Sequence, residues 1–491
     1  MLFNSVIFIM VFLPLCLLGW YILQKLNNPV YAKIFLTLMS LWFYGYYNPW
    51  YLIVLLVSLL INYVCSIGLE KIHTLSKRRI VFILGLIANI GILFYFKYFN
   101  FFMDNCRFLF HGDWQLEKIA LPLGISFFTF QQISYLVDRY KRKAPHYTAV
   151  DYACFITFFP QLIAGPIVLH NEFIPQLHER KTRKLRADDF YDGISLFTLG
   201  LAKKVLLADV LALVVNNVFN EYAIIPYYLD ILSAWVTMLC YMFQLYFDFS
   251  GYCDMARGIA RMFGMYLPTN FNAPYKAVSV KDIWSRWHMT LTRFLTTYVY
   301  YPLGGNRKGK YRQCLNILVV FLVSGIWHGA NWTFLIWGLL NGIAIVFETL
   351  FPKLRFQKEW LNCLKTDILF LLSLVLFRSD SLSMAFTYYR KMFAGGYSGY
   401  LFTMGKNFTI PEAYTIIKFL KLYGPQYLPY FGLICIMIFL FIGILLLKGK
   451  KADEWISVKG QTRKGLFLLG TLFTWSVISL SQVSTFLYFN F

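Results

Sequence analysis

Apolar runs of about 20 residues recur along the whole of this sequence, and an α-helix needs that length to cross a bilayer. Clear examples are the runs at 51–69, 80–98 and 428–447. Only 14% of the residues are charged, against about 25% in soluble domains. The sequence therefore predicts an all-α polytopic membrane protein with about 11–13 membrane segments, some of them re-entrant. Membrane lipids are its expected surroundings.

The positive charge of the chain is concentrated in loops and indicates an orientation. The net charge is +22, but cytoplasmic loops of membrane proteins are rich in Lys and Arg, so we do not expect nucleic acid as a partner. The loops at 70–79 and 138–146 are basic, whereas those at 48–50 and 101–118 are not. This alternation predicts a multi-pass protein of the cell membrane with cytoplasmic basic loops and an extracytoplasmic N-terminus. The apolar run at 1–23 is interpreted as a retained first helix.

Three segments depart from the simple spanning pattern. Residues 151–170 are interrupted by Pro160, Gly165 and Pro166 and have basic flanks at 138–146 and 179–186, which predicts a re-entrant segment. Residues 248–312 combine many charges with Trp and Tyr, which indicates helices at the cytoplasmic interface. Residues 378–427 are expected to form a long loop.

The most informative segment contains His328. Residues 313–326 and 334–350 are apolar, the sequence WHGANWT lies between them, and the outer flanks are basic. This pattern predicts a helical hairpin. Fourteen helical residues rise about 21 Å, against a hydrocarbon core of about 30 Å, which places His328 inside the bilayer. A histidine there is a functional hypothesis, since a neutral imidazole can accept a proton. The alternative is a hydrogen bond that joins neighbouring helices.

Other polar residues admit two interpretations each. His288 follows Trp284 and Trp287 and is either an interface residue or part of a site. The two histidines lack metal-site spacing, and the nine cysteines are scattered without CxxC spacing, so no metal is expected. Asp248 and Asp254 stand next to a membrane helix end, where one interpretation is that they simply pair with Arg257 or Arg261. The alternative is a Ser-His-Asp hydrolase that uses Ser250, for which no GxSxG motif is present.

Taken together, several motifs resemble those of the membrane-bound O-acyltransferase family, and within it the membrane subunit of the alginate O-acetylation type. They are YFDFSGYCDMA at 246–256, NFNAPY at 270–275, IWSRWHMTL at 283–291, YVYYPLGGNRKG at 298–309 and SGIWHGANWT at 324–333. We expect a single membrane domain over 1–491, with a motif-bearing core at about 119–350 and C-terminal helices at 367–491. The resemblance implies a ring of tilted helices around a thinned centre that contains a tunnel.

The resemblance also assigns residues. It places the invariant histidine of the family at His328 and a second polar position at His288, both expected to be catalytic. Residues expected to bind the donor or acceptor, or to line the tunnel, are Asn272, Asp248, Ser250, Trp287, Trp327, Asn331 and Arg286. Relatives often carry an Arg-Asp pair before the YVYY motif. This chain has Arg293 followed by Phe294, Leu295, Thr296 and Thr297 instead, so that pair is missing.

The activity implied is acyl transfer from a thioester to a hydroxyl. We expect acetyl-coenzyme A, or another acyl thioester, as the donor substrate and no bound cofactor; basic loops attract such an anionic donor. His328 is expected to act as general base, while His288, with Asn272 or backbone donors, orients the donor or stabilises the oxyanion. The expected acceptor is an extracytoplasmic polysaccharide or cell-wall polymer, reached through a separate SGNH-type acyltransferase.

Two alternatives stay open. D-alanyl transfer to teichoic acid from a carrier protein is the alternative within the family, although the GGNRKG turn and the length of 491 residues favour polysaccharide acetylation. A membrane transporter is the alternative of another class. A transporter predicts inverted repeats with broken helices in matching halves, and the sequence shows no internal repeat.

Overall fold

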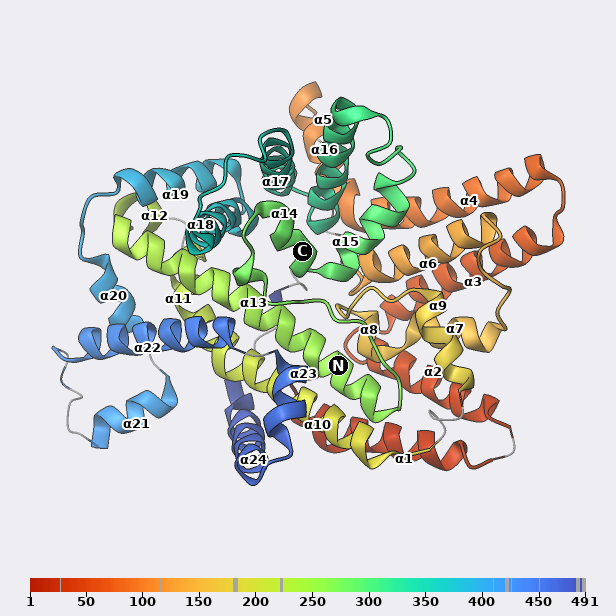
Figure 1. The fold of residues 1–491 in the computed structure, drawn as a ribbon, viewed down its shortest axis with the longest axis horizontal. Helices are drawn as coiled ribbons and strands as arrows, with labels where there is room; N and C mark the ends of the chain where they lie inside the picture. Colours follow the sequence, from red (N-terminus) through yellow and green to blue (C-terminus); the bar gives the residue numbers. More distant parts are fainter. Residues whose placement is uncertain are drawn as a thin grey trace.

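The computed structural model describes the chain except residues 27, 113, 115–116, 118, 180–183, 221–223, 409, 420–423, 425, 450, 483–485 and 488–491. Within the described part, every regular element is a helix (Figure 1). Six helical stretches there are long and apolar enough to cross a membrane: Trp50–Lys71, Leu75–Phe110, Ile231–Met262, Trp332–Leu350, Glu359–Arg378 and Leu428–Leu447. The prediction of an all-α polytopic membrane protein is confirmed, and the number of 11–13 segments stays a prediction. Of the basic flank at 179–186, residues 180–183 lie outside the described part.

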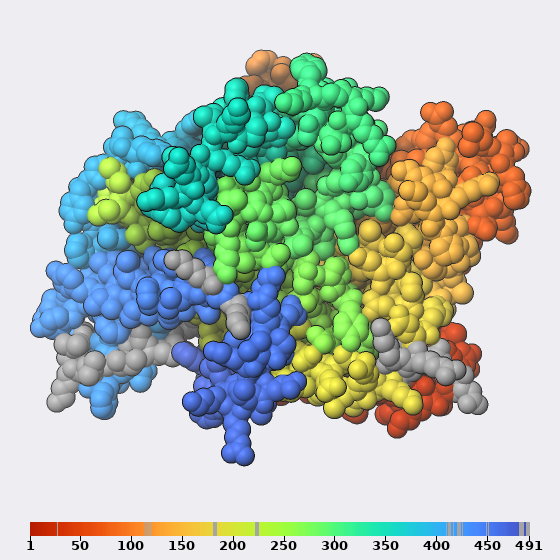
Figure 2. Space-filling view, in the orientation of Figure 1, coloured from red at the N-terminus to blue at the C-terminus, as the bar shows by residue number. Residues whose placement is uncertain are grey.

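The N-terminal third packs as a group of apolar helices with polar contacts between them. Its members are α1 (Leu13–Leu23), α2 (Val30–Gly45), α3 (Trp50–Lys71), α4 (Leu75–Leu93) and α6 (Ile125–Tyr140), red to orange in Figures 1 and 2. Helix α5 (Phe99–Phe110) lies apart from this group, at the top of Figure 1. Gln132 on α6 accepts a hydrogen bond from Ser58, and Asn89 donates to Asn62 at 2.7 Å. Such polar pairs hold helices together where lipid gives no hydrophobic drive.

The predicted interruption at 151–170 is confirmed. The chain forms the short helices α7 (Ala149–Thr157), α8 (Phe159–Leu162) and α9 (His170–Phe173), separated by irregular backbone. Phe158, Leu162 and Val168 are fully buried in this segment. Broken backbone at membrane depth is tolerated only inside protein or beside a cavity, and this burial meets that condition.

Helix α13 (Ile231–Met262) is the long diagonal helix at the centre of Figure 1. Its 32 residues span about 48 Å. It packs most extensively against α10 (Ala187–Ala202) and also against α11 (Asp209–Phe219). Residues 248–262 continue α13 and are mostly buried within the protein, so they form no separate helix. That residues 248–312 lie at the cytoplasmic interface stays a prediction.

Charges within α13 are buried because the helical segment Lys203–Ala208, which follows α10, brings matching cations. Lys204 Nζ lies 2.6 Å from Asp248 and 2.7 Å from Asp209, and Lys203 Nζ lies 2.6 Å from Asp254. The two lysines lie more than 40 residues from Asp248 and Asp254 in sequence, so the pattern of α13 alone could not reveal these pairs. Paired in this way, the carboxylates tolerate an interior that would be costly for isolated charges.

Glycines allow a close contact between α10 and α13. On α13, Gly251 and Gly258 are seven residues apart, as are Gly193 and Gly200 on α10, so each pair falls on one face after two turns. A Cβ at Gly200 would lie 2.5 Å from the carbonyl oxygen of Gly251, and a Cβ at Gly258 would lie 2.5 Å from that of Gly193. The two backbones therefore touch, as is typical of small-residue helix interfaces in membranes.

The predicted hairpin is confirmed as α16 (Gly309–His328) and α17 (Trp332–Leu350). It follows α14 (Val280–Arg286) and α15 (Met289–Leu295) and precedes α18 (Glu359–Arg378). A Cβ at Gly325 would lie 2.4 Å from the carbonyl oxygen of Phe334, so the two helices cross closely near the tip.

One prediction for the C-terminal part is wrong. The expected loop at 378–427 contains α19 (Leu382–Ala394), α20 (Tyr400–Asn407) and α21 (Pro411–Phe419). Helix α19 buries Met384, Tyr388 and Met392 on one face, a four-residue period within a segment too polar to resemble a spanning helix. The remaining helices are α12 (Ile224–Tyr227), α22 (Leu428–Lys448), α23 (Ala452–Trp455) and α24 (Arg463–Ile478).

Candidate active site

His328 is the last residue of α16 and is 3% exposed. Its ring packs against those of Trp327, Trp337 and Phe377, with centroids 4.9, 5.0 and 5.2 Å away. These rings come from α16, α17 and α18. The histidine is thus enclosed by aromatic surface at the point where the hairpin turns.

Lys97 forms hydrogen bonds with the last backbone carbonyls of α16. It lies in the helical stretch Leu75–Phe110, and its Nζ donates to the carbonyl oxygens of Trp327 at 2.6 Å and His328 at 3.3 Å. A third contact, at 3.3 Å, joins it to Ser126 Oγ. The last carbonyls of a helix lack helical partners and carry partial negative charge, so a cation there stabilises the end. The sequence interpretation missed Lys97, although a lysine inside the apolar run at 80–98 was a signal for it.

His288 lies close to His328, with ring centroids 6.5 Å apart. It is 1% exposed and precedes α15 with φ 45° and ψ 48°, the left-handed region. A non-glycine residue seldom adopts that conformation, and such strain concentrates at functional sites. Its ring packs against Phe249 on α13 and against Trp327. The structure therefore brings together the two histidines that the sequence singled out.

Asn270, which the sequence interpretation did not select, supports His288. It lies in the connection between α13 and α14, and its Oδ1 is 3.2 Å from His288 Nδ1. The interpretation had selected Asn272 in the same NFNAPY motif. Asn272 contacts the chain before His288 through its backbone, since its N–H donates to the carbonyl oxygen of Arg286 at 2.8 Å.

Two cavities approach the histidines from opposite ends of the hairpin. The base cavity measures about 450 Å³ and runs along α15 and the first half of α16; its lining includes Lys281, His288, Leu291, Ile317, Val320 and Thr349. The tip cavity measures about 610 Å³ and lies at the turn of the hairpin; its lining includes Lys97, Asn331, Phe334, Phe377, Arg378 and Asp380. A small pocket of about 30 Å³ between Lys97, Trp327 and His328 shares Lys97 with the tip cavity.

The other residues selected from the sequence divide into two groups. Trp327 and Asn331 lie at the site: Trp327 packs between Phe127, Phe130 and His288, and Asn331 lines the tip cavity while its Oδ1 accepts the N–H of Thr333.

The second group lies around the site. Asp248 is held in its ion pair with Lys204, and Ser250 lines a separate cavity of about 50 Å³ beside Lys203 and Arg257. Arg286 donates to Asp282 on its own helix. Trp287 packs against Phe271 and Phe370. Across the described residues, no group of three or more His, Cys, Asp or Glu side chains could hold a metal ion.

Comparisons with known proteins agree with this geometry. The model of the membrane-bound O-acyltransferase family matches residues 32–369. The peptidoglycan O-acetyltransferase of Helicobacter pylori is 44% identical over 373 residues, which cover 70% of each chain. The "Probable alginate O-acetylase AlgI" of Pseudomonas aeruginosa is 36% identical over 406 residues, 81% of this chain and 75% of the relative.

A more distant relative belongs to the D-alanyl branch. The teichoic acid D-alanyltransferase of Bacillus subtilis is 28% identical over 250 residues, which cover 49% of this chain and 62% of the relative. All these proteins transfer an acyl group according to their names. The family match covers more than half of the sequence, including both histidines, and so the chain belongs to the membrane-bound O-acyltransferase family and is an O-acyltransferase.

Proposed function

We propose that this enzyme moves an acetyl group from an acyl thioester in the base cavity to an acceptor hydroxyl in the tip cavity, for the O-acetylation of a cell-wall glycan. The observation that carries the proposal is a pair of neighbouring buried imidazoles: His288 lines the base cavity, and His328 lines the small pocket that shares Lys97 with the tip cavity. A donor and an acceptor can then meet at the histidines without either one crossing the protein.

The base cavity suits the arm of an acyl thioester. Leu291, Ile317 and Val320 give it an apolar wall, and about 450 Å³ is within the range of small-molecule sites. Lys281 lies in its lining, and the turn at 304–312 adds four further Lys or Arg residues. These cations favour the phosphates of coenzyme A at the cavity mouth.

In the reaction proposed, His328 acts as general base. The acceptor hydroxyl gives its proton to the imidazole while its oxygen attacks the thioester carbonyl. The new C–O bond forms and the C–S bond breaks, and the leaving thiolate takes the proton from the His328 imidazolium, which returns to its neutral form. A positioned base of this kind contributes about 10²- to 10⁴-fold to the rate.

A glycan acceptor is supported by the relatives. Those that match most of the chain are named for acetylation of peptidoglycan and alginate, whereas the D-alanyl relative matches about half of it. We place the tip cavity on the extracytoplasmic face of the cell membrane, where an SGNH-type acyltransferase receives the acetyl group and passes it to the polymer. The cytoplasmic basic loops then lie on the donor side.

The test combines cells with the purified full chain. In cells without the gene, peptidoglycan should lose its base-labile acetate, and the wild-type gene should restore it. In proteoliposomes, purified enzyme should release thiol from labelled acetyl-coenzyme A when membranes carrying the acceptor are added. Unchanged peptidoglycan acetate with lowered D-alanine on teichoic acid would favour the D-alanyl alternative. Substrate flux without acyl transfer would favour a transporter.

A further inference from the structure

The side chain of Asn270 is bonded on both of its polar ends. It is 1% exposed, and its Oδ1 accepts the N–H of Thr290 at 3.1 Å and the Thr290 hydroxyl at 2.9 Å. Its Nδ2 donates to Cys253 Sγ at 3.4 Å. The same Oδ1 lies 3.2 Å from His288 Nδ1. Asn270 therefore joins α13, the start of α15 and the ring of His288.

These contacts determine which nitrogen of His288 carries the proton. A backbone N–H can only donate, so the amide atom that faces the N–H of Thr290 must be the oxygen of Asn270. An amide oxygen can only accept, so His288 Nδ1 must donate to it and bears the hydrogen. In a neutral imidazole with hydrogen on Nδ1, the other nitrogen, Nε2, is a hydrogen-bond acceptor.

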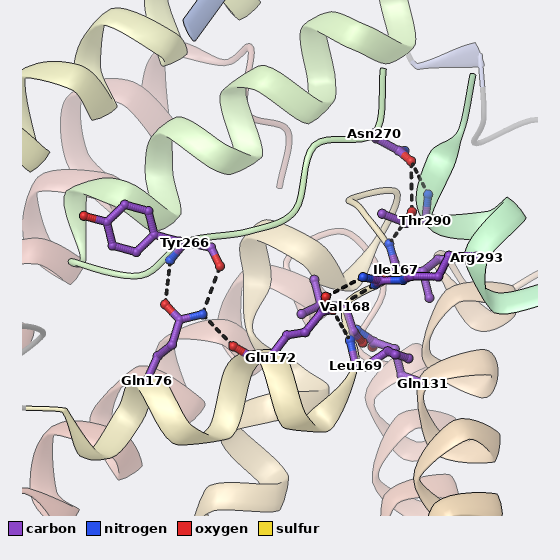
Figure 3. A network of polar contacts seen from close by, with 10 residues as sticks. All are labelled: Gln131, Ile167, Val168, Leu169, Glu172, Gln176, Tyr266, Asn270, Thr290 and Arg293. Atoms are coloured by element: carbon purple, nitrogen blue, oxygen red, sulfur yellow. Dashed lines mark hydrogen bonds and ion pairs between the residues drawn. The ribbon is translucent and has the colours of Figure 1, made fainter. Parts of the chain in front are cut away.

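A wider network holds this arrangement in place (Figure 3). Thr290 Oγ1 accepts the N–H of Ile167 at 3.0 Å, and Arg293 Nη2 donates to the Ile167 carbonyl at 3.1 Å. Arg293 also forms a two-pronged ion pair with Glu172. The interrupted segment that carries Ile167 and Glu172 thus supports α15. Where relatives often carry an adjacent Arg-Asp pair, Arg293 is paired with an acid from a segment 121 residues away.

We infer that Asn270 is a positioning residue that fixes His288 as the Nδ1–H tautomer, so that Nε2 accepts the amide N–H of a pantetheine-type thioester arm in the base cavity. This inference rests on the proposed function of that cavity. It decides between the two roles expected for His288. An oxyanion is stabilised by a hydrogen-bond donor, and neutral His288 in this tautomer offers an acceptor instead.

A pair of donor substrates tests this hydrogen bond. S-acetyl-N-acetylcysteamine carries the arm's amide two carbons from sulfur, and its ester analogue replaces that N–H by oxygen. Wild-type enzyme in membranes with its acceptor should use the amide donor about 10-fold better in kcat/KM, because an unpaired polar atom in the ester complex is costly. Asn270→Leu should lower activity toward the amide donor about 10- to 100-fold and remove most of this preference.

Three variants make the test specific. Asn270→Asp keeps an acceptor for His288 Nδ1–H and should retain the preference, which also shows that the position tolerates substitution. Cys253→Ala removes only the partner of Asn270 Nδ2 and should match wild type. His288→Ala should lose the preference for the amide donor, as Asn270→Leu does. All rates are taken per folded protein, measured by size-exclusion chromatography.

The outcomes separate the inference from the proposed function. If Asn270→Leu lowers activity equally toward both donors, or leaves the preference intact, Asn270 has a structural role only and the inference is overturned. The same follows if Asn270→Asp loses the preference in folded protein. If wild-type enzyme transfers acetyl from neither donor nor from acetyl-coenzyme A, the proposed function fails and the inference fails with it.

Discussion

The surroundings of His328 and His288 differ in kind, although the two rings are neighbours. His328 ends a helix, is enclosed by aromatic rings, and has its backbone carbonyl held by Lys97. His288 has left-handed backbone and a side chain held by an amide within a polar network. One side chain is thus placed by packing and a helix end, and the other by hydrogen bonds. We expect the first to tolerate changes of distant polar residues and the second to depend on them.

The largest effect should come from His328 itself. His328→Ala removes the proposed base and should lower acetyl transfer at least about 100-fold, while folding and membrane insertion are retained. Transfer is measured as acetate on the polymer, and folding by size-exclusion chromatography. Retained transfer in the folded variant would exclude the proposed mechanism.

Lys97→Met tests whether the end of α16 must be held. The substitution keeps the length of the side chain but removes its hydrogen bonds to the carbonyls of Trp327 and His328. We expect a loss of about 10- to 100-fold in kcat with little change in the KM for the donor, as for other residues that orient a reacting group. Lys77→Met, at an exposed position, is the matched control. If both variants behave alike, Lys97 does not position His328.

Gly325→Ala tests the helix packing that places His328. The added methyl group would lie 2.4 Å from the carbonyl oxygen of Phe334, so α16 and α17 must separate, at about 1–3 kcal/mol of stability. Gly91→Ala is the control, because a Cβ there meets no atom within 4 Å. Thermal unfolding in detergent should show a lower Tm for the first variant only. An equal Tm would mean that the hairpin adjusts without strain.

The smallest effect concerns the ion pair between Glu172 and Arg293, which belongs to the polar network around His288. Glu172→Gln or Arg293→Gln should lower stability by about 1 kcal/mol, because both side chains are only partly buried. The double variant should lower the stability by little more than either single variant. The preference of the enzyme for the amide donor should fall in these variants and stay unchanged in Gly325→Ala. Strictly additive effects would show that the pair does not act as a unit.

Most of the fold followed from local sequence patterns. The apolar runs, the interruption by Pro160 and Pro166, and the hairpin around His328 were each predictable, because length and breaks are local properties. The course of α13 beyond Asp248 was not. Its charges are buried only because Lys203 and Lys204 face them, and that pairing depends on how α10 crosses α13.

The site shows the same limit on a smaller scale. His328 was identified by its depth, and His288 by the resemblance. Asn270 and Asn272 stand two residues apart in one motif, and no pattern tells which of them faces His288. The turn that follows, with Ala273 at φ 46°, is part of the backbone path that sets their directions. Lys97 was visible as a charge in an apolar run, but the Trp327 carbonyl that it holds lies 230 residues away.

In the proposed reaction, Trp327 and the two histidines form the partition between donor and acceptor, and this arrangement has an electrical consequence. If the cavities open to opposite faces of the bilayer, water and ions enter both, and the membrane voltage falls mainly across Trp327 and the two histidines. A proton that crosses this partition during transfer experiences most of that voltage, about 2.3 kcal/mol per 100 mV. Acetylation would then run faster or slower with the energised state of the membrane, which an imposed potassium diffusion potential in proteoliposomes can measure.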